Sequence, residues 1–210
     1  MSIKLSILVP TVPNRIDNYY LRIMTDLIQQ VTPYPNIELL ALFDNKKRTI
    51  GKKRDDMLAL AKGEYLVFID DDDRLSPDYV KDIMAALSAN PDTDCVVFDC
   101  ICKVNSGPDK LCKYGIEFEY GDILGGKEWR GKPAHTMVYK SSIAKRHPFT
   151  DMGHGEDVEW VKRACLDIRN QTRIDKVLYH YDAEYATTSE TGPLSDAVIR
   201  KNLEKRFGIY

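Results

Sequence analysis

The first half of the chain alternates short apolar runs with amphipathic stretches. Residues Leu5–Val9, Glu38–Phe43 and Tyr65–Ile69 are rich in aliphatic and aromatic side chains, which is typical of strands buried on both faces of a sheet. The stretches at about 14–30 and 51–61 place apolar residues at helical spacing and end at proline or glycine. This strand–helix alternation predicts an α/β domain with a parallel sheet and right-handed crossovers.

The second half is less regular. Ser76 and Pro77 favour the N-cap and first residue of a helix that ends near Asn90. The later expected elements are strands at Cys95–Val104, Thr136–Tyr139 and Val177–Tyr181 and helices at Glu156–Cys165 and Ser195–Phe207, with glycine-rich loops and hairpins up to Gly131. We therefore expect a single domain over residues 1–210, with a regular half at about 1–104 and an irregular half at about 105–210.

Four consecutive aspartates, Asp70 to Asp73, directly follow the third apolar run. Like charges this close repel one another, and a hard divalent cation such as Mg²⁺, Mn²⁺ or Ca²⁺ would relieve that repulsion. Ligands of open α/β sheets bind beyond the carboxyl ends of the strands. The aspartates therefore indicate a ligand site at this sheet edge, and the alternative is a solvated acidic turn.

Two further polar groups are expected near the same edge. Asp44 ends the second strand, and the basic run 46–54 enters the next helix, which favours binding of a nucleotide diphosphate. The alternatives are a turn residue and a solvated helix face. Gly155 precedes Glu156 and Asp157 at a helix start, where the helix dipole keeps carboxylates ionised. Such a carboxylate could take a proton from an attacking hydroxyl, or it could simply cap the helix.

Composition narrows the class of protein. The chain has 210 residues, 43% hydrophobic, and a net charge of -2, which indicates a folded domain without a strong field for nucleic acid or membrane. No signal peptide or transmembrane run is recognisable. The five cysteines form no CxxC pair, which favours a reduced, cytoplasmic protein. A zinc site built from Cys95, Cys100, Cys102 and Cys112 is conceivable, but the spacing matches no common zinc motif.

Together these motifs resemble the GT-A fold glycosyltransferases of family 2 over nearly the whole chain. The similar segments are SILVPT, LALFD, KRDDMLALAKGEY, FIDDDDRLSP and GHGEDVEW. The resemblance implies a Rossmann-like, mostly parallel central sheet flanked by helices, with a nucleotide-sugar-binding half at about 1–104 and an irregular acceptor-binding half at about 105–210. It also implies inverting, metal-dependent transfer of a sugar from a nucleotide diphosphate sugar, most commonly a UDP-sugar, to a hydroxyl acceptor.

The resemblance further implies roles for individual residues. Asp70 and Asp72 match the two acids of the DxD motif that holds Mn²⁺ or Mg²⁺, and Asp71 between them is expected to point away and to tolerate replacement. Asp157 matches the catalytic base, with Glu156 beside it orienting the acceptor or loop. The residues expected to contact the nucleotide sugar are Pro10, Thr11, Asp44, Arg54, Asp70 and Asp73, of which Asp73 also supports the loop.

Other roles are implied only faintly. Trp160 and His154 are candidates for acceptor contacts, although a helical Trp more often belongs to the core. His180 and Glu184 are candidates for a third metal ligand, because relatives often carry Tyr-Arg-x-His here. The loop after the second strand, NKKRTIGKK, departs from the Ser-x-Asp-Gly-Thr of relatives, which leaves open the bound nucleotide.

Three competing classes fit the sequence less well. A sugar nucleotidylyltransferase would need a glycine-rich loop where VPTVPNR stands, an aspartyl phosphatase would need Thr or Val in place of Arg74, and an EF-hand fails at Leu75 and Lys81. A non-catalytic module that binds a nucleotide sugar stays open as the alternative. For the acceptor we expect a soluble hydroxyl-bearing molecule; a modified DNA base, reached by base flipping, is a minority hypothesis raised by the local basic clusters.

Overall fold

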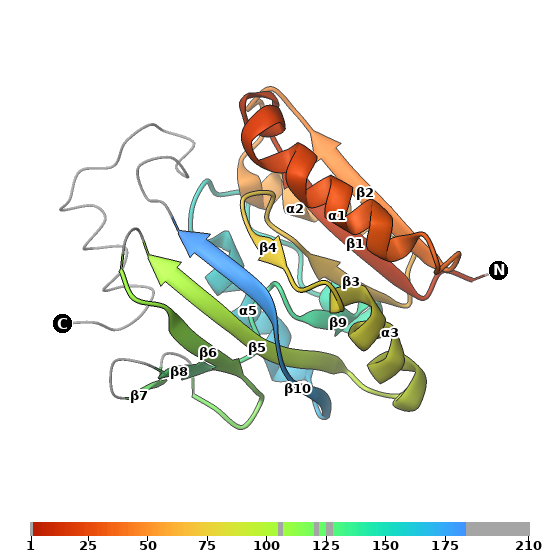
Figure 1. Cartoon of the computed structure of the whole chain (residues 1–210), viewed down its shortest axis with the longest axis vertical. Helices are drawn as coiled ribbons and strands as arrows, with labels where there is room; N and C mark the ends of the chain where they lie inside the picture. The colour runs from red at the N-terminus through yellow and green to blue at the C-terminus, as the bar shows by residue number, and fades with distance from the viewer. Residues whose placement is uncertain (1, 105–106, 120–121, 125–127, 184–210) are drawn as a thin grey trace.

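The computed structural model describes residues 2–104, 107–119, 122–124 and 128–183. The strands in these residues are β1 (Leu5–Thr11), β2 (Ile37–Phe43), β3 (Tyr65–Phe68), β4 (Arg74–Leu75), β5 (Cys95–Val104), β6 (Lys110–Tyr114), β7 (Asp122–Leu124), β8 (Glu128–Gly131), β9 (Val138–Lys140) and β10 (Gln171–Ala183). They form one ten-stranded sheet in the order β2-β1-β3-β9-β5-β6-β8-β7, with β10 beside β5 and β4 beside β10 (Figure 1).

The first three strands form the parallel part that the sequence predicted. β1 pairs in parallel with both β2 and β3, so Leu5 lies between Ile37 and Tyr65. All residues of β1 and β3 are buried, whereas β2 lies at the sheet edge and is half-buried. Because parallel strands share their direction, Thr11, Asp44 and the aspartates after β3 come to the same edge.

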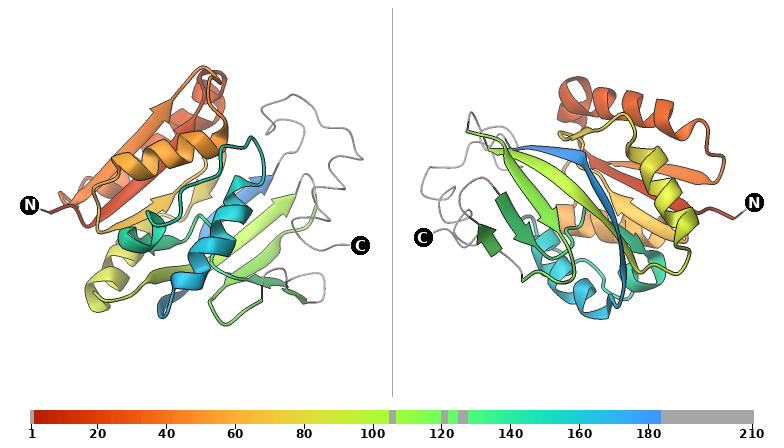
Figure 2. Two further views of the ribbon diagram at one scale, coloured as in Figure 1. Left: turned by 180° about the vertical axis from the view of Figure 1, so that it is seen from behind. Right: turned by 60° about the horizontal axis from the view of Figure 1, so that its bottom comes forward.

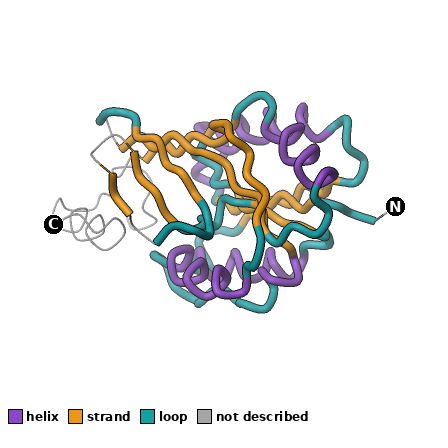
Figure 3. Tube along the Cα trace, turned by 90° about the horizontal axis from the view of Figure 1, so that it is seen from below, coloured by secondary structure: helices purple, strands orange, loops and turns teal. Residues whose placement is uncertain are grey.

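Two helical layers cover the sheet (Figures 2 and 3). The helices are α1 (Leu21–Val31), α2 (Ile50–Leu60), α3 (Tyr79–Ala89), the short α4 (Ser141–Ala144) and α5 (Glu156–Ala164). α1 and α3 lie on one face of the sheet, and α2 and α5 lie on the other. None of the helices in the described ranges is long and apolar enough to span a bilayer.

Two helix starts differ from the sequence prediction. α1 begins at Leu21 rather than near Asn14, because a 3-10 turn (Pro13–Arg15) and a π turn (Ile16–Tyr20) come first. These turns lead the chain from β1 across the acidic edge before the helix starts. Asp78 rather than Ser76 occupies the N-cap position of α3, without a side-chain capping hydrogen bond, and the Ser76 carbonyl accepts the Tyr79 amide in a turn before the helix.

The second half adds mostly antiparallel strand pairs to the parallel ones, so the central sheet of the predicted α/β fold is mixed. β9 joins the halves, because it pairs antiparallel with both β3 and β5. β10 is longer than the predicted Val177–Tyr181, and it runs parallel to β5 while its far part pairs with β4. β4 begins directly after the aspartates, so β10 brings the late part of the chain against them. The predicted helix at 195–207 lies outside the described residues.

Candidate functional site

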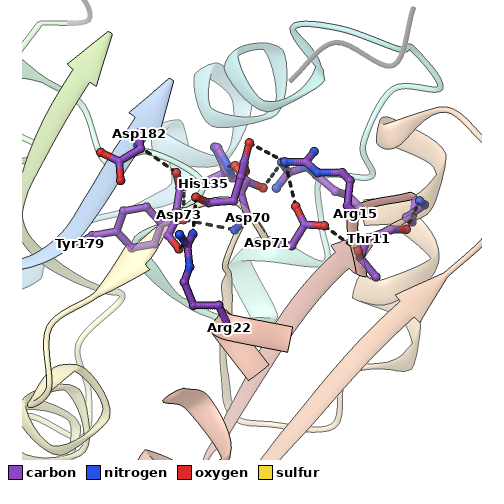
Figure 4. Close-up of polar contacts among 12 residues, drawn as sticks. Thr11, Arg15, Arg22, Asp70, Asp71, Asp73, His135, Tyr179 and Asp182 are labelled. Atoms are coloured by element: carbon purple, nitrogen blue, oxygen red, sulfur yellow. Dashed lines mark hydrogen bonds and ion pairs between the residues drawn. The ribbon is translucent and has the colours of Figure 1, made fainter. Parts of the chain in front are cut away.

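The loop Asp70–Asp73, called the acidic loop below, makes a tight turn after β3. The Asp73 amide donates to the Asp70 carbonyl at 3.2 Å, and the Asp70 amide donates to the Tyr179 hydroxyl at 3.2 Å. Figure 4 shows the side chains leaving this turn in different directions, toward β1 on one side and toward β10 on the other. The acidic loop is therefore built into the fold, and the reading of a merely solvated turn does not describe it.

Asp71 does not point away from the protein, contrary to the sequence expectation. It is 2% exposed, and its Oδ2 accepts the Thr11 hydroxyl at 2.6 Å. Arg15, from the turn after β1, places Nη2 3.0 Å from Asp71 and 2.5 Å from Asp72 (Figure 4). Burial raises the pKa of Asp71 to about 6, although Arg15 and Thr11 act in the opposite direction. Asp71 thus ties the loop to the end of β1.

Asp73 ties the other end of the acidic loop to β10. It is 0% exposed, its Oδ2 accepts the Tyr179 hydroxyl at 2.6 Å, and its Oδ1 accepts the Asp182 amide at 3.3 Å. Burial, together with the neighbouring Asp72 and Asp70, holds the pKa of Asp73 well above its usual range. This position suits the support role that was expected of Asp73, and it leaves no exposed surface for a donor.

Asp70 is held by Arg54, which reaches it from α2. Nη2 of Arg54 lies 2.7 Å from Oδ1 of Asp70, and Nε lies 3.2 Å from Oε1 of Glu156 on α5. Burial alone would raise the pKa of Asp70, but Arg54 and His135 bring it below its usual range. Arg54 is 4% exposed, and its Nη1 has no hydrogen-bond partner among the residues that the structure describes. One donor of a buried guanidinium thus remains for a further acceptor.

His135 was not identified from the sequence. Its Nε2 lies 3.3 Å from Oδ2 of Asp70, and its Nδ1 lies 3.4 Å from Oδ2 of Asp157. The ring is 6% exposed and comes from the segment that leads into β9. The surrounding Pro133-Ala134-His135-Thr136 carries no periodicity or motif, so only the folded arrangement reveals this contact.

The start of α5 has the glycine turn that the sequence predicted. Gly155 is the N-cap with φ of 80°, a left-handed conformation that other residues adopt only with strain. Glu156 and Asp157 follow in the first turn of the helix. Glu156 is 4% exposed, and burial raises its pKa although Arg54 lowers it. The turn therefore buries Glu156 against Arg54 and leaves Asp157 facing His135.

Asp70, His135 and Asp157 share a partly open pocket with a volume of about 70 Å³. A water needs at least about 10–15 Å³ measured in this way, so a few waters or a small chemical group would fill it. The remaining walls are mostly aromatic, thiol and aliphatic side chains: Tyr114, Trp129, Tyr179, Tyr181, Cys100, Cys102, Cys112, Val158 and Val161. Carboxylates therefore meet an otherwise largely apolar cavity at this point.

Asp44 and the N-terminal contacts lie along the same sheet edge but outside this cluster. Asp44 accepts the Arg48 amide at 3.1 Å and pairs with Lys53 at 2.7 Å. Lys53 is 1% exposed and also donates to the Thr11 carbonyl at 2.7 Å. Pro10 and Thr11 end β1 beside β2. The sequence did not identify Lys53 as the buried partner of Asp44.

The basic run is largely engaged within the protein. Lys52 pairs with Asp56 at 2.8 Å, and Arg48 pairs with the same carboxylate at 3.1 Å. Lys53 and Arg54 point inward to the acids already described. These pairs neutralise much of the positive charge that motivated the DNA hypothesis, which stays a prediction from sequence.

Three weaker candidates lie elsewhere. Trp160 is 0% exposed, stacks on Phe149 with centroids 4.8 Å apart, and donates to the His147 carbonyl, so it belongs to the core and not to the pocket wall. His154 is exposed in the turn before α5. His180 lies in β10 between two pocket-lining tyrosines, and strand alternation turns it to the opposite face, away from the acidic loop. Glu184 lies outside the described residues.

The chain supplies few protein ligands for a metal. Within the described ranges, no group of three or more His, Cys, Asp or Glu side chains is arranged to hold one, which includes the cysteine set considered for zinc. All five thiols are free. A Mg²⁺ ion is often held by only one or two carboxylates and by substrate phosphates. Asp70 and Asp72, with side chains 22% and 13% exposed, fit that donor set.

Comparison with known proteins adds the family and the fold. No curated protein matches the sequence. The structure is similar to S. aureus TarS residues 1–349 in complex with UDP-GlcNAc, with TM-score 0.62, 16% identity, 97% of this chain and 65% of that chain covered. The complex of TarS 1–349 with UDP has a TM-score of 0.60 and 15% identity, with 99% of this chain and 72% of that chain covered. A third structure, TarS 1–349, has a TM-score of 0.60 and 18% identity, with 86% of this chain and 60% of that chain covered.

The chain thus spans 60% and 65% of the length of two of these TarS chains and 72% of the other, and identities of 15–18% show the fold alone. The profile described as Glycosyl transferase family 2 matches residues 42–148, just over half of the 210 residues. That stretch includes Asp44, Arg54, the acidic loop and His135. The chain belongs to glycosyl transferase family 2 and has its GT-A type α/β fold.

Proposed function

We propose that this protein transfers a sugar from a UDP-sugar to a hydroxyl acceptor with inversion at the anomeric carbon. One observation carries the proposal: the first acid of the acidic loop and the acid at the start of α5, Asp70 and Asp157, lie in one pocket on opposite sides of His135. A donor-side carboxylate and a base candidate are thereby placed together. The UDP complexes of TarS support the choice of nucleotide.

On the donor side, the chain has a positively charged group for the diphosphate and negatively charged groups for a cation. Arg54 has its Nη1 without a hydrogen-bond partner in the described residues, and a diphosphate oxygen is a suitable acceptor for it. Asp70 and Asp72 would hold Mn²⁺ or Mg²⁺ together with the diphosphate. A divalent cation there would neutralise the negative charge that develops on the leaving diphosphate. Thr11 and Asp44 would flank the base at the ends of β1 and β2.

On the acceptor side, Asp157 would act as the general base. The acceptor oxygen forms a bond to the anomeric carbon while the bond from that carbon to the diphosphate oxygen breaks, and its electron pair leaves with the UDP. The acceptor proton passes to Asp157, which the start of α5 keeps ionised through the helix dipole. Attack from the face opposite the diphosphate inverts the configuration, and no covalent enzyme intermediate is required.

The alternative is a module that binds the nucleotide sugar without turning it over. Wild-type protein incubated with UDP-glucose, UDP-galactose and UDP-N-acetylglucosamine, with Mn²⁺ or with EDTA, separates the two. The proposed transferase releases UDP slowly even with water as acceptor. For a module that only binds, the UDP-sugar raises the melting temperature of the protein and no UDP is released. Absence of both UDP release and UDP binding would overturn the proposed function.

Asp72→Ala tests the metal assignment in the same assay. We expect it to abolish the difference between Mn²⁺ and EDTA in UDP affinity, measured by calorimetry. His180→Ala is the matched control, since His180 faces away from the acidic loop, and it should retain that difference. UDP binding that is equally tight in EDTA for the wild type would exclude the cation from the proposal.

A further inference from the structure

His135 stands between the two halves of the proposed site. Asp70 belongs to the acidic loop after β3, and Asp157 belongs to α5, 87 positions later in the chain. Two carboxylates that face one cavity repel each other unless a hydrogen-bond donor or a positive charge lies between them. The imidazole fills this place, with Nε2 3.3 Å from Asp70 and Nδ1 3.4 Å from Asp157.

The imidazole is itself fixed. His135 is 6% exposed, and the backbone that follows it enters β9, which pairs with both β3 and β5. A planar ring with nitrogens on two edges holds its partners at a set separation, whereas a flexible chain would not. Because the sheet fixes the ring, the ring in turn holds the Asp157 carboxylate of α5 in a defined position relative to the sheet.

A closed circuit of contacts surrounds the ring. Arg54 contacts Asp70 at 2.7 Å and Glu156 at 3.2 Å, and Glu156 precedes Asp157 on α5. His135 closes the circuit between Asp70 and Asp157. Arg54 thus holds the donor-side acid and the helix start, and His135 contacts the base candidate itself.

We propose that His135 is a positioning residue that aims the Asp157 carboxylate at the acceptor oxygen by holding it from the Nδ1 side. This inference rests on the proposed function, because it takes Asp157 as the base. Misplacing a catalytic group by about 1 Å can lower a rate by roughly 100-fold. Loss of the ring should therefore slow turnover and leave UDP binding in place, since Arg54 still holds Asp70.

The two amide substitutions of histidine form a matched pair. The Asn amide reaches about as far as Nδ1 of histidine, on the Asp157 side, and the Gln amide reaches about as far as Nε2, on the Asp70 side. We expect His135→Asn to keep kcat for UDP-sugar hydrolysis within about threefold of wild type. We expect His135→Gln and His135→Ala to lower kcat by roughly 10- to 100-fold, with the Kd for UDP within about twofold of wild type.

A double-mutant cycle tests whether His135 acts through Asp157. The variant carrying both His135→Ala and Asp157→Asn should be no slower than Asp157→Asn alone, because effects that pass through one group do not add. Additive losses would overturn the proposal. So would equal kcat values for His135→Asn and His135→Ala, or losses of kcat that simply follow the melting temperatures of the variants.

A readout without turnover separates this proposal from the proposed function. In protein labelled with ¹⁵N-histidine, the resonances of His135, assigned through His135→Asn, report both ring nitrogens. Asp157→Asn should move the Nδ1 resonance, and Asp70→Asn should move the Nε2 resonance. If Asp157→Asn moves neither, the contact is absent and the proposal fails, whether or not the protein hydrolyses a UDP-sugar. If the resonances respond as expected but no UDP-sugar is bound or hydrolysed, the contact exists without the reaction and the positioning role is overturned with the proposed function.

Discussion

The acidic loop and the start of α5 both concentrate carboxylates. In both segments, buried acids alternate along the chain with partly exposed ones. In the loop, Asp71 and Asp73 are 2% and 0% exposed and are bound by Thr11, Arg15 and Tyr179. At α5, Glu156 is 4% exposed and is bound by Arg54. The neighbouring acids Asp70, Asp72 and Asp157 keep side-chain exposures of 22%, 13% and 13%.

The difference lies in what surrounds the exposed acids. In the loop, arginines contact both of them, so positive charge is already near the proposed diphosphate. At α5, the exposed acid faces an imidazole, which can share a proton but carries no permanent charge. The difference between guanidinium partners at the acidic loop and an imidazole partner at α5 fits the proposed division of roles, in which the loop side binds the diphosphate and the α5 side takes up the acceptor proton. The following predictions test that division, from the largest expected effect to the smallest.

The largest effect is expected from Asp157→Asn. If the start of α5 moves the proton, hydrolysis of UDP-sugar should fall by about 100- to 10,000-fold, the range typical of general base catalysis. UDP affinity should stay within about twofold of wild type, because the acidic loop and Arg54 are untouched. Steady-state kinetics and calorimetry measure the two quantities. A parallel loss of UDP affinity would make Asp157 a structural residue and would contradict the division of roles between the acidic loop and the start of α5.

The next effect concerns stability. Arg54→Met leaves the buried carboxylate of Glu156 and the partly buried carboxylate of Asp70 without their cation, and removing one partner of a buried ion pair costs about 3–5 kcal/mol. Urea unfolding followed by circular dichroism measures the change. Arg163→Met is the matched control, since it removes a surface pair with Glu159 that contributes about 1 kcal/mol or less. Equal losses in the free energy of unfolding for the two variants would show that Arg54 does not link the acidic loop to the start of α5.

A smaller loss is expected from Asp71→Ala. The substitution leaves the buried Thr11 hydroxyl without its acceptor and removes one contact of Arg15, which costs about 1–3 kcal/mol. Thermal unfolding in EDTA measures it, with Asp92→Ala in the exposed turn after α3 as the control. A neutral Asp71→Ala would return this residue to the outward position that the sequence suggested.

The smallest effect is a pH dependence. Because burial raises the folded pKa of Asp71 to about 6, the folded protein retains a proton that the unfolded chain releases. Stability from this group is therefore lost as pH rises from about 4 to about 6, by of the order of 1–2 kcal/mol. Asp71→Asn should flatten that slope in urea unfolding at pH 4.5, 5.5 and 6.5 with EDTA present. A wild-type-to-variant difference that stays constant across these values would contradict it.

The sequence predicted the parallel half and the acids at strand ends because both follow from local pattern. β1, β2 and β3 read as apolar runs, and the position of Asp70 after β3 follows directly. The glycine turn before α5 was also local, since Gly155 stands beside the two acids. Such features depend on neighbours in the chain, and hydrophobic periodicity or turn chemistry describes them.

What the sequence missed depends on partners distant in the chain. His135 acquires its place only when β9 joins β3 to β5, and Lys53 looks like a surface lysine until Asp44 meets it. Asp71 was misjudged because the DxD match gives roles only to the acids on either side of it, whereas its partners Thr11 and Arg15 lie far away in the chain. Trp160 was predicted as an acceptor contact, but it is fully buried in the core, as helical tryptophans more often are.

The bond between Tyr179 and Asp73 joins residues 106 positions apart. During synthesis the first β-α-β units can pair while β10 is still unmade, yet the acidic loop then lacks the strand that fixes its far end. Closing such a long loop is slow, and topology of this kind delays the last stage of folding. We therefore expect the acidic loop to reach its final geometry late, after β10 has been made, and a truncated chain without β10 should not retain nucleotide.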